Sequence, residues 1–376
     1  PDEKAPPRWS GNLKQSKLGI VKDAVRTLDA DSKSAINSST GFITECARSF
    51  WTPTVADSYW AFRPQGGCEI DDVSYDNSNF PDGKVVEKGA QAYVLRSSTT
   101  RTVRTCSSVF GSCSDPGALL TFSTTTASKA DLGDAAMTDA THSLLIDWQK
   151  GIDNQNENNN DVAIVEMRPT AHGDVVHSRP IAINYGTDAA PKVVVFYGGN
   201  DGVLRAVNGN RANAYDGVAA GQEIWSFIPP EFYGSIKRLR DNKPLVSFKG
   251  NPNEDADPDN DWVPAPQPKP YGMDGAITAY EKSSLFVGMR RGGRALYAFN
   301  ISNIVGDPDA DPVVTPEDPS LLWKVGCPSL TSDDDCLAGF DDIGQTWSSA
   351  RPFKSEGYVT PSPAKPHAVA AVVSQL

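Results

Sequence analysis

The stretch VVVFYGGNDGVLRAVNGN, Val193 to Asn210, returns later in the chain as SLFVGMRRGGRALYAFNIS, Ser284 to Ser302. Each copy runs as an apolar strand, a Gly-rich turn and an alternating strand ending in Asn, and each is followed by a Trp-bearing strand in GQEIWSFIPP or LLWKVG. A further strand precedes each copy, in HSRPIAINYG and YGMDGAITAYEK, so the repeating unit has four strands. The segment DDIGQTWSSARPF begins a third unit.

Repetition of a short antiparallel unit with a tryptophan at one matched place is typical of β-propeller blades. The sequence therefore predicts an all-β dominated fold, a modified β-propeller of four-stranded antiparallel blades with helical and loop insertions. Because propellers close with about four to eight blades, we expect the ring to be incomplete within this chain. We expect Trp225 and Trp323 to pack between blades, because packing requires a ring at one fixed strand position; stacking on a sugar or a quinone is the alternative.

Four regions follow from the pattern. Residues 1–82 are expected to form a linker, a short helix and an irregular segment, and residues 83–161 a pre-propeller or first-blade region. Residues 162–354 are expected to form the propeller blades. Residues 355–376 are a tail in which the blade is incomplete. Apolar residues at helical spacing predict amphipathic helices at Ser16–Ala30 and Ala140–Gly151. The middle of the insertion at Pro229–Val246 also has a helical pattern.

The charge balance disfavours two kinds of partner. Lys and Arg total 35 against 47 for Asp and Glu, which gives a net charge of −12. Duplex DNA or an anionic bilayer would be repelled on average, so we expect no nucleic-acid partner. The basic runs at Lys237–Arg240 and Arg290–Arg294 are interpreted as a solvated helix face and a turn. No apolar run is long enough for a transmembrane segment.

The six cysteines fall into pairs that are close in the sequence. None forms a C-x-x-C motif and no histidine lies near a pair, which favours disulfides over zinc and indicates an oxidising compartment. Six cysteines allow many pairings, and of these we expect the local ones: Cys46 with Cys68, Cys106 with Cys113, and Cys327 with Cys336. The opening PDEKAPPRWSGN is not a signal peptide, so we expect the chain to be a mature or excised part of an exported protein.

Two segments carry residue types that chemistry uses. His, Asp and Ser cluster in His172-Gly-Asp174-Val-Val-His177-Ser178, where a hydrolase or metal site is conceivable. Strand alternation would place the two histidines on opposite faces, so we interpret the cluster as structural. Gly198–Gly202 reads as a hairpin turn and not as a phosphate loop, because a strand and not a helix follows it. The sequence has no enzyme signature, and we expect no catalytic activity.

Calcium is the one cofactor that the sequence suggests. Carboxylates recur at every second residue of an acidic loop, a ligand type that calcium prefers: Asp255, Asp257, Asp259 and Asp261. The loop lacks the Gly and Glu of an EF-hand, so an acidic insertion that binds no ion is the alternative.

Longer phrases resemble a known family. HGDVVHSRPIAINYG, VVVFYGGNDGVLRAVNG, GQEIWSFIPPEFYGSIKRLRDN, GGRALYAFNIS and DDIGQTWSSARP closely resemble the C-terminal region of the PilC/PilY family of type IV pilus assembly and tip-adhesin proteins. GFITECARSFW and FPDGKVVEKGAQAYVLR look like the segment before its propeller. The resemblance covers roughly residues 17 to 354.

The resemblance implies a modified β-propeller exported to the periplasm, the outer membrane surface and the pilus tip. It also implies association with minor pilins, a role in pilus biogenesis and twitching motility, and attachment to host cells or abiotic surfaces. The family's D-x-D-x-D-x-x-x-D calcium loop lies in a later blade that this chain does not reach, so the Asp255–Asp261 run does not inherit its role.

Two functions of different classes follow. The first is a non-enzymatic pilus biogenesis factor and tip adhesin of the fimbrium. The second is a periplasmic quinoprotein dehydrogenase of the pyrroloquinoline quinone type, because Gly-x-Leu-x-Ala-x-Asn followed by Trp is reminiscent of quinone-binding propellers. Such enzymes carry adjacent cysteines beside the quinone, and here no two cysteines adjoin.

Overall fold

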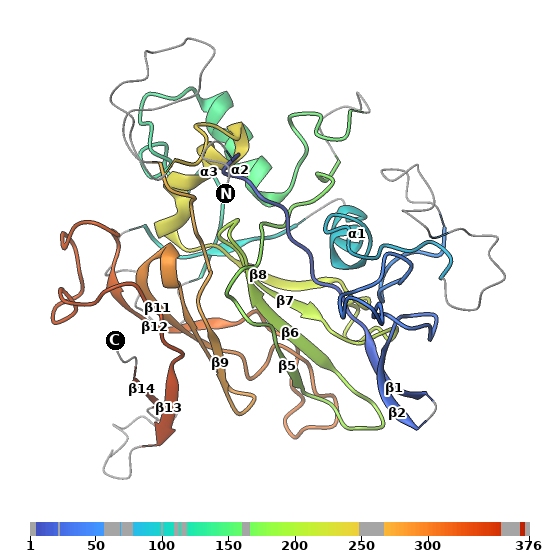
Figure 1. Cartoon of the computed structure of the whole chain (residues 1–376). Coiled ribbons are helices and arrows are strands. Elements are labelled where there is room, and N and C mark those ends of the chain that lie inside the picture. The colour runs from blue at the N-terminus through green and yellow to red at the C-terminus, as the bar shows by residue number, and fades with distance from the viewer. Residues whose placement is uncertain are drawn as a thin grey trace.

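The computed structural model describes residues 5–21, 23–55, 68, 78–98, 101–108, 113, 119–159, 166–247, 267–354 and 369–372. Within these ranges short, mostly antiparallel strands are the commonest regular structure, and none of the sheets closes into a barrel. Two sheets, each of which contains one copy of the repeated unit, lie side by side (Figure 1).

The first repeated unit forms four consecutive antiparallel strands. They are β5 (Ile181–Asn184), β6 (Val193–Gly198), β7 (Leu204–Asn208) and β8 (Glu223–Phe227). Two further strands extend the sheet beyond β8: β3 (Arg104–Thr105), which runs parallel to β8, and β4 (Leu120–Thr121). The region before residue 161 therefore supplies strands to the sheet of the first unit.

The second unit repeats the first. Its strands are β9 (Ile277–Tyr280), β10 (Ser284–Gly288), β11 (Arg294–Asn300) and β12 (Ser320–Cys327), again paired in sequence order. After it, β13 (Arg351–Lys354) pairs with β14 (Val369–Val372). The predicted four-stranded unit is confirmed in both copies.

An irregularity of register recurs at the same place in each unit. The shift lies between Ala206 and Val207 in the first unit and between Ala298 and Phe299 in the second. In both units the alanine before the shift pairs with the tryptophan of the last strand, Trp225 or Trp323. Because such bulges fix the local bend and twist of a strand, the two units share a shape as well as a sequence pattern.

Aromatic rings join the two sheets. Trp225 of β8 is 3% exposed and meets Phe299 of β11 edge to face, with ring centroids 5.4 Å apart. Phe227 meets Tyr297 in the same way at 5.3 Å. The packing interpretation of Trp225 is thus confirmed, and each such pair adds about 1 kcal/mol beyond the area it buries. Trp323 is half-buried and packs in a cluster that includes Ala350, at the start of the third unit.

A buried ion pair also crosses between the units. Glu231, from the insertion after β8, lies 2.5 Å from the Nζ atom of Lys324 on β12 and accepts a 2.6 Å hydrogen bond from the Tyr297 hydroxyl. Burial lowers the pKa of Lys324, and the neighbouring Glu231 opposes that shift. Because either charge alone would be costly in the interior, the pair fixes how the insertion sits against the second sheet.

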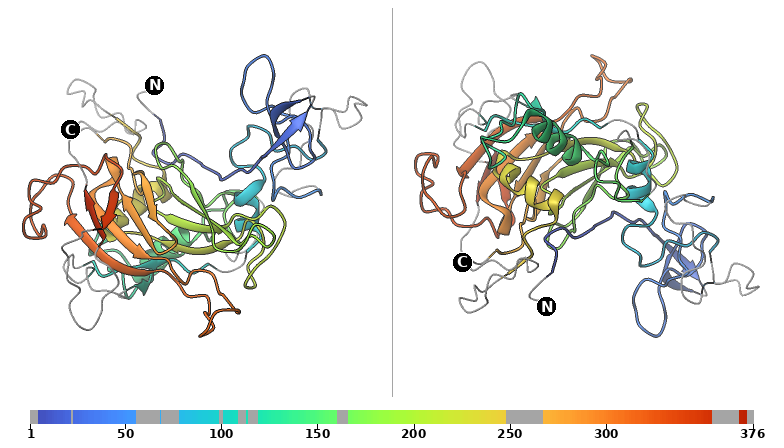
Figure 2. Two further views of the ribbon diagram at one scale, coloured as in Figure 1. Left: turned by 90° about the horizontal axis from the view of Figure 1, so that it is seen from below. Right: turned by 90° about the horizontal axis from the view of Figure 1, so that it is seen from above.

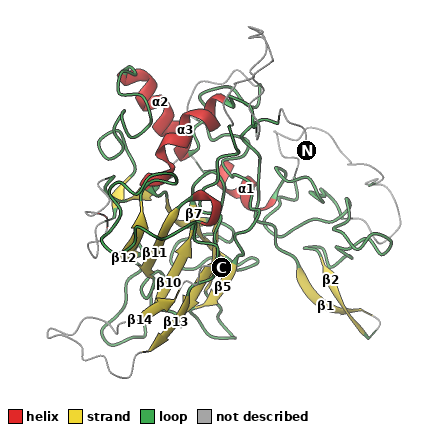
Figure 3. Ribbon diagram, turned by 60° about the vertical axis from the view of Figure 1, so that its left-hand side comes forward, coloured by secondary structure: helices red, strands yellow, loops and turns green. Residues whose placement is uncertain are grey.

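Helices cover one end of the sheets. They are α2 (Asp139–Lys150) and α3 (Tyr233–Asp241), with the 3₁₀ turn η2 (Pro230–Phe232) before α3 and α1 (Ala90–Arg96) farther along the first sheet. The side chain of Thr138 caps α2 by accepting from the amide of Thr141, and α2 ends at Gly151 with φ +108°. Figures 1 and 3 show α2 and α3 side by side. The helices predicted at Ala140–Gly151 and in the middle of Pro229–Val246 are confirmed as α2 and α3. Among the described residues, no helix has the length and apolar character needed to cross a membrane.

The predicted helix at Ser16–Ala30 is wrong. This segment is a hairpin of β1 (Lys17–Val21) and β2 (Ala24–Leu28), joined by a tight turn in which Asp23 has φ +62°. The β-branched residues of the segment favour strands over a helix. The hairpin stands away from the two sheets (Figures 2 and 3).

Three disulfide bonds stabilise the irregular parts of the chain. They join Cys46 to Cys68, Cys106 to Cys113 and Cys327 to Cys336. These are the local pairs expected from the sequence. Closing loops of this size contributes about 2 to 4 kcal/mol each, mainly by restricting the unfolded chain.

Candidate functional site

The turn between β6 and β7 lies at the centre of a buried polar cluster. Asp201 in the turn pairs with Arg205 of β7, which has no exposed surface and also donates to the Ala171 carbonyl at 3.1 Å. Glu223 lies 3.6 Å from the Nε atom of Arg205 and accepts two hydrogen bonds from Arg101, at 2.7 and 2.8 Å. Two arginines and two carboxylates therefore neutralise one another inside the protein.

The acidic neighbours of Arg205 keep it charged. Burial acts to lower the pKa of Arg205, but Asp201 and Glu223 outweigh burial and hold that pKa above its usual range. Arg168 stacks on the Trp148 ring at 3.9 Å; burial lowers its pKa to about 10, with Glu157 opposing. Because Arg205 stays charged at every physiological pH, we interpret it as holding structure and not as transferring protons.

His172 lies against this cluster as a neutral side chain. It is 4% exposed, and its Nε2 atom pairs with the Gln91 side chain and lies 3.3 Å from the Tyr197 hydroxyl. Burial, and then the positive charge of Arg205, lowers the pKa of His172 well below its usual value. The folded protein therefore resists protonating this imidazole.

A pH dependence of stability follows from His172. Above about pH 6.5 the imidazole is neutral in both the folded and the unfolded protein. Below about pH 6.5 the imidazole becomes protonated in the unfolded chain but stays neutral in the folded protein. We therefore expect the free energy of unfolding to fall with decreasing pH by up to about 1.4 kcal/mol per pH unit from this residue alone. Urea unfolding at about pH 7 and pH 5.5 should show a shallower pH dependence in His172→Gln than in the wild type. Equal dependence in the two proteins would contradict this assignment.

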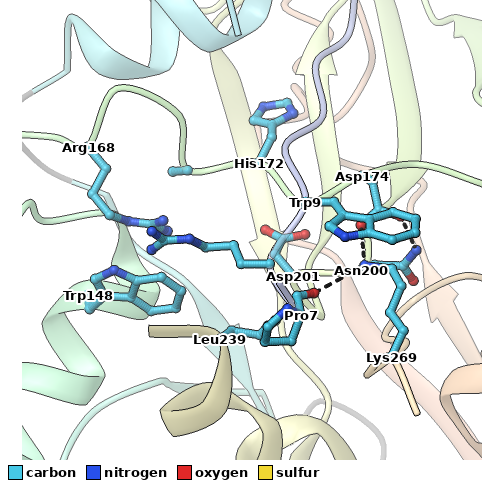
Figure 4. Close-up of a pocket in the computed structure, with 13 residues that line it drawn as sticks. Pro7, Trp9, Trp148, Arg168, His172, Asp174, Asn200, Asp201, Leu239 and Lys269 are labelled. Carbon is cyan, nitrogen blue, oxygen red and sulfur yellow. Dashed lines mark hydrogen bonds and ion pairs between the residues drawn. The ribbon is translucent and has the colours of Figure 1, made fainter. Parts of the chain in front are cut away.

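The cavity beside the cluster is too small for a ligand. Its volume is about 10 Å³, close to the space needed by one water molecule. Figure 4 shows Trp148, Arg168 and Lys269 around it. Lys269 lies 2.8 Å from Asp174, which also accepts from the Asn200 amide at 2.9 Å. We interpret this cavity as a small gap in side-chain packing and not as a binding site.

The histidines singled out in the sequence do not converge. His177 places its Nδ1 atom 2.6 Å from Asp274, in the segment before β9, whereas His172 faces Gln91. Ser178 accepts a hydrogen bond from the amide of Gly198 at 2.9 Å. The expected strand alternation is not the reason that the two histidines diverge, because residues 172–178 precede β5 and do not form a strand. Gly198–Gly202 forms the expected hairpin turn between β6 and β7.

The candidate calcium ligands Asp255, Asp257, Asp259 and Asp261 lie outside the described residues. One other acidic group stands near sulfur atoms: Asp333, beside Cys327 and Cys336. Those sulfurs are bonded to each other, and Asp333 pairs with Arg294 at 2.7 Å. We therefore interpret this group as a structural contact.

A second cavity, of about 920 Å³, lies in the N-terminal region. Apolar atoms of Phe42, Ile43 and Val86 form part of its wall, next to the Cys46–Cys68 disulfide. Its two lysines already have partners: Lys84 lies 2.6 Å from Glu45, and Lys14 lies 2.9 Å from Asp82. The part of the cavity wall that remains available to a ligand is therefore mainly apolar.

Sequence reasoning missed the buried ion cluster around Arg205. The available signal was an arginine inside the apolar strand LRAVN with an aspartate four residues before it. Comparisons with protein-family models, with curated proteins and with solved structures found no match for this chain. Functional inference therefore rests on the residues themselves.

Proposed function

We propose that this chain is a non-enzymatic binding scaffold of the type IV pilus machinery, acting in pilus biogenesis and as a tip adhesin. The observation that carries the proposal is the pair of stacked four-stranded units, held by Trp225 against Phe299 and by Glu231 against Lys324. A rigid framework of this kind presents its loops at fixed positions, and recognition usually resides in such loops.

A β-propeller is the architecture that best accounts for these units. The matched register shifts, the packing of neighbouring units through their tryptophans and the start of a third unit at β13 all support it. Blades of a propeller repeat in this way around a common axis.

The remaining parts of the proposal concern location and partners. The three disulfides support export to the periplasm and the outer surface. The resemblance to the PilC/PilY family points to minor pilins at the pilus tip and to host-cell or abiotic surfaces as partners. Calcium, if it acts in this chain, would be bound by the Asp255–Asp261 loop.

The pairing of the titratable groups supports a scaffold over the quinoprotein alternative. His172, His177 and Asp174 each have a structural partner, and the cavity beside the Arg205 cluster has room for about one water. All six cysteines are in disulfides that are not formed between adjacent residues.

Deleting residues 162–354 in the native host should reduce surface piliation, twitching motility or attachment, while the pilin subunit is still expressed. The expected cause is loss of the scaffold that contacts the minor pilins, so a pull-down with those pilins should also fail. A strain with normal pili and adhesion that instead lost a periplasmic, quinone-dependent oxidation would overturn the proposal.

A further inference from the structure

The two cognate turns of the repeated units differ in how they are covered. The first-unit turn is closed by α2, where Gln149 donates to the Asp201 carbonyl at 2.8 Å. The second-unit turn, η3 (Arg290–Gly292), lies instead beside Trp347, whose side chain is 48% exposed. The guanidinium carbons of Arg290 and Arg291 are 4.7 and 5.5 Å from the centre of its ring. Two adjacent arginines therefore meet an open aromatic face.

Neither arginine has an acidic partner among the described residues. Arg294, in the same strand pair, is matched with Asp333, and the protein as a whole carries 12 excess negative charges. Arg291 donates only to the neutral hydroxyl of Tyr271, at 3.1 Å, and the Nε atom of Arg290 is buried without a partner. Two neighbouring guanidinium groups that have no acidic partner within the described part of an acidic protein are available to an anion from outside.

The turn is also held in a fixed and costly conformation. Arg290 has φ +51°, a left-handed backbone that residues with side chains rarely adopt. The Thr346 hydroxyl holds it there by accepting from the amides of Met289 and Arg290, at 2.7 and 3.2 Å. Because Trp347 follows Thr346 directly, the same contact places the backbone of Trp347 beside the arginines. Strain that surrounding contacts maintain is common where a protein binds a ligand.

The aromatic surface continues away from Trp347. Arg291 lies 5.4 Å from the centre of the Tyr271 ring. Lys269 then lies 6.0 Å from that ring and 4.2 Å from the ring of Trp9, which is 43% exposed. Lys269 is itself only 4% exposed and pairs with Asp174 at 2.8 Å, so this surface offers a ligand the cations of Arg290 and Arg291 and not that of Lys269.

We propose that this arginine–tryptophan surface, formed by Arg290, Arg291, Trp347 and Tyr271, binds a carboxylated polysaccharide. The C–H groups of a pyranose ring carry slight positive charge and pack on the negative face of an indole. A carboxylate on the same sugar fits the planar fork of a guanidinium through two hydrogen bonds. The Tyr271 ring, 5.4 Å from Arg291, would hold a further sugar ring of the same chain. This site does not depend on the proposed pilus function.

Single-stranded nucleic acid is the competing ligand, because bases also stack on aromatic rings. The arrangement of the cations favours the saccharide. A nucleic acid needs a continuous basic groove along its phosphates, whereas the described part of this surface places only two adjacent cations, Arg290 and Arg291, beside the Trp347 ring.

The proposal can be tested by isothermal titration of the whole chain with oligogalacturonate. Its methyl ester, with the same rings and no charge, serves as the matched ligand. We expect binding of the acid in the micromolar to millimolar range and at least about tenfold weaker binding of the ester, from the loss of a charged hydrogen bond. Arg291→Ala and Trp347→Ala should each weaken binding of the acid by about tenfold or more.

Arg211→Ala is the matched control variant. Arg211 is also exposed and lies 5.5 Å over an aromatic ring, that of Phe50, but away from the proposed surface. It should bind the acid as the wild type does, and all variants should keep the wild-type melting temperature. Equal binding of acid and ester, no binding at millimolar concentration, or unchanged binding in Arg291→Ala would overturn the proposal. Tighter binding of oligothymidylate, lost in the same variants, would assign the surface to nucleic acid instead.

Discussion

Replacing Arg205 by methionine should lower the free energy of unfolding by about 3 to 5 kcal/mol, the usual cost of breaking a buried ion pair from one side. Methionine fills much of the space of the arginine stem, so the loss comes mainly from charge. Asp201 would lose its partner in a place where water cannot replace it, and the Ala171 carbonyl would lose a 3.1 Å hydrogen bond. Since whole domains are stable by only about 5 to 15 kcal/mol, the variant should be close to unfolding at room temperature.

Arg104→Met is the matched control. Arg104 also pairs with an aspartate, Asp318, but the two side chains are 32% and 43% exposed. Exposed pairs contribute about 0 to 1 kcal/mol, so this variant should unfold at nearly the wild-type urea concentration. Adding Asp201→Asn to Arg205→Met should recover part of the loss, because it removes the unpaired charge. If both single variants lost the same stability, the buried cluster would not have the role assigned to it.

The repeated units were predictable because their signals are local. Apolar alternation, Gly-rich turns and a tryptophan at one matched place are properties of neighbouring residues, and strand pairing in sequence order follows from short connections. The local disulfides were predictable for a similar reason. Helix α2 was marked by apolar residues at helical spacing and by Gly151 at its end.

The β1–β2 hairpin was not predictable by spacing alone. Leu18, Val21, Val25 and Leu28 recur at intervals that suit a helix, and a window this short also fits two strands. In the hairpin, Leu18, Ile20 and Val25 share one face and are 72%, 78% and 69% exposed. A prediction from the spacing of apolar residues assumes that these residues face a core. The prediction fails for this hairpin because its apolar residues are exposed.

The Arg205 cluster and the arginine–tryptophan surface could not be derived from the sequence because both depend on tertiary contacts. An arginine within a strand is normally expected on the exposed face. Arg205 is instead buried and contacts Asp201, the Ala171 carbonyl and Glu223. Glu223 lies on a different strand. Conversely, Arg290 and Arg291 were interpreted as an ordinary turn, because nothing in their neighbourhood in the sequence reveals that Trp347 lies beside them.

Gly202→Ala should lower the free energy of unfolding by about 2 to 5 kcal/mol, from two separate causes. Gly202 has φ +84°, a conformation that costs a residue with a Cβ atom about 1 to 2 kcal/mol. In addition, the new Cβ atom would lie 2.1 Å from Cδ1 of Phe232, whose ring is 1% exposed and belongs to η2. Moving a ring in a packed core costs about 1 to 3 kcal/mol more.

Gly217→Ala separates the two causes. Gly217 has nearly the same backbone, φ +78°, and an added Cβ atom there would meet no atom within 4 Å. Gly217→Ala should therefore lower the free energy of unfolding only by the cost of the left-handed backbone conformation, about 1 to 2 kcal/mol. Urea unfolding of both variants measures the difference, which is the cost of displacing Phe232. Because Phe232 packs between the first-unit turn and the helical cluster of α2 and α3, a difference near zero would mean that the turn does not hold the helices against the sheet.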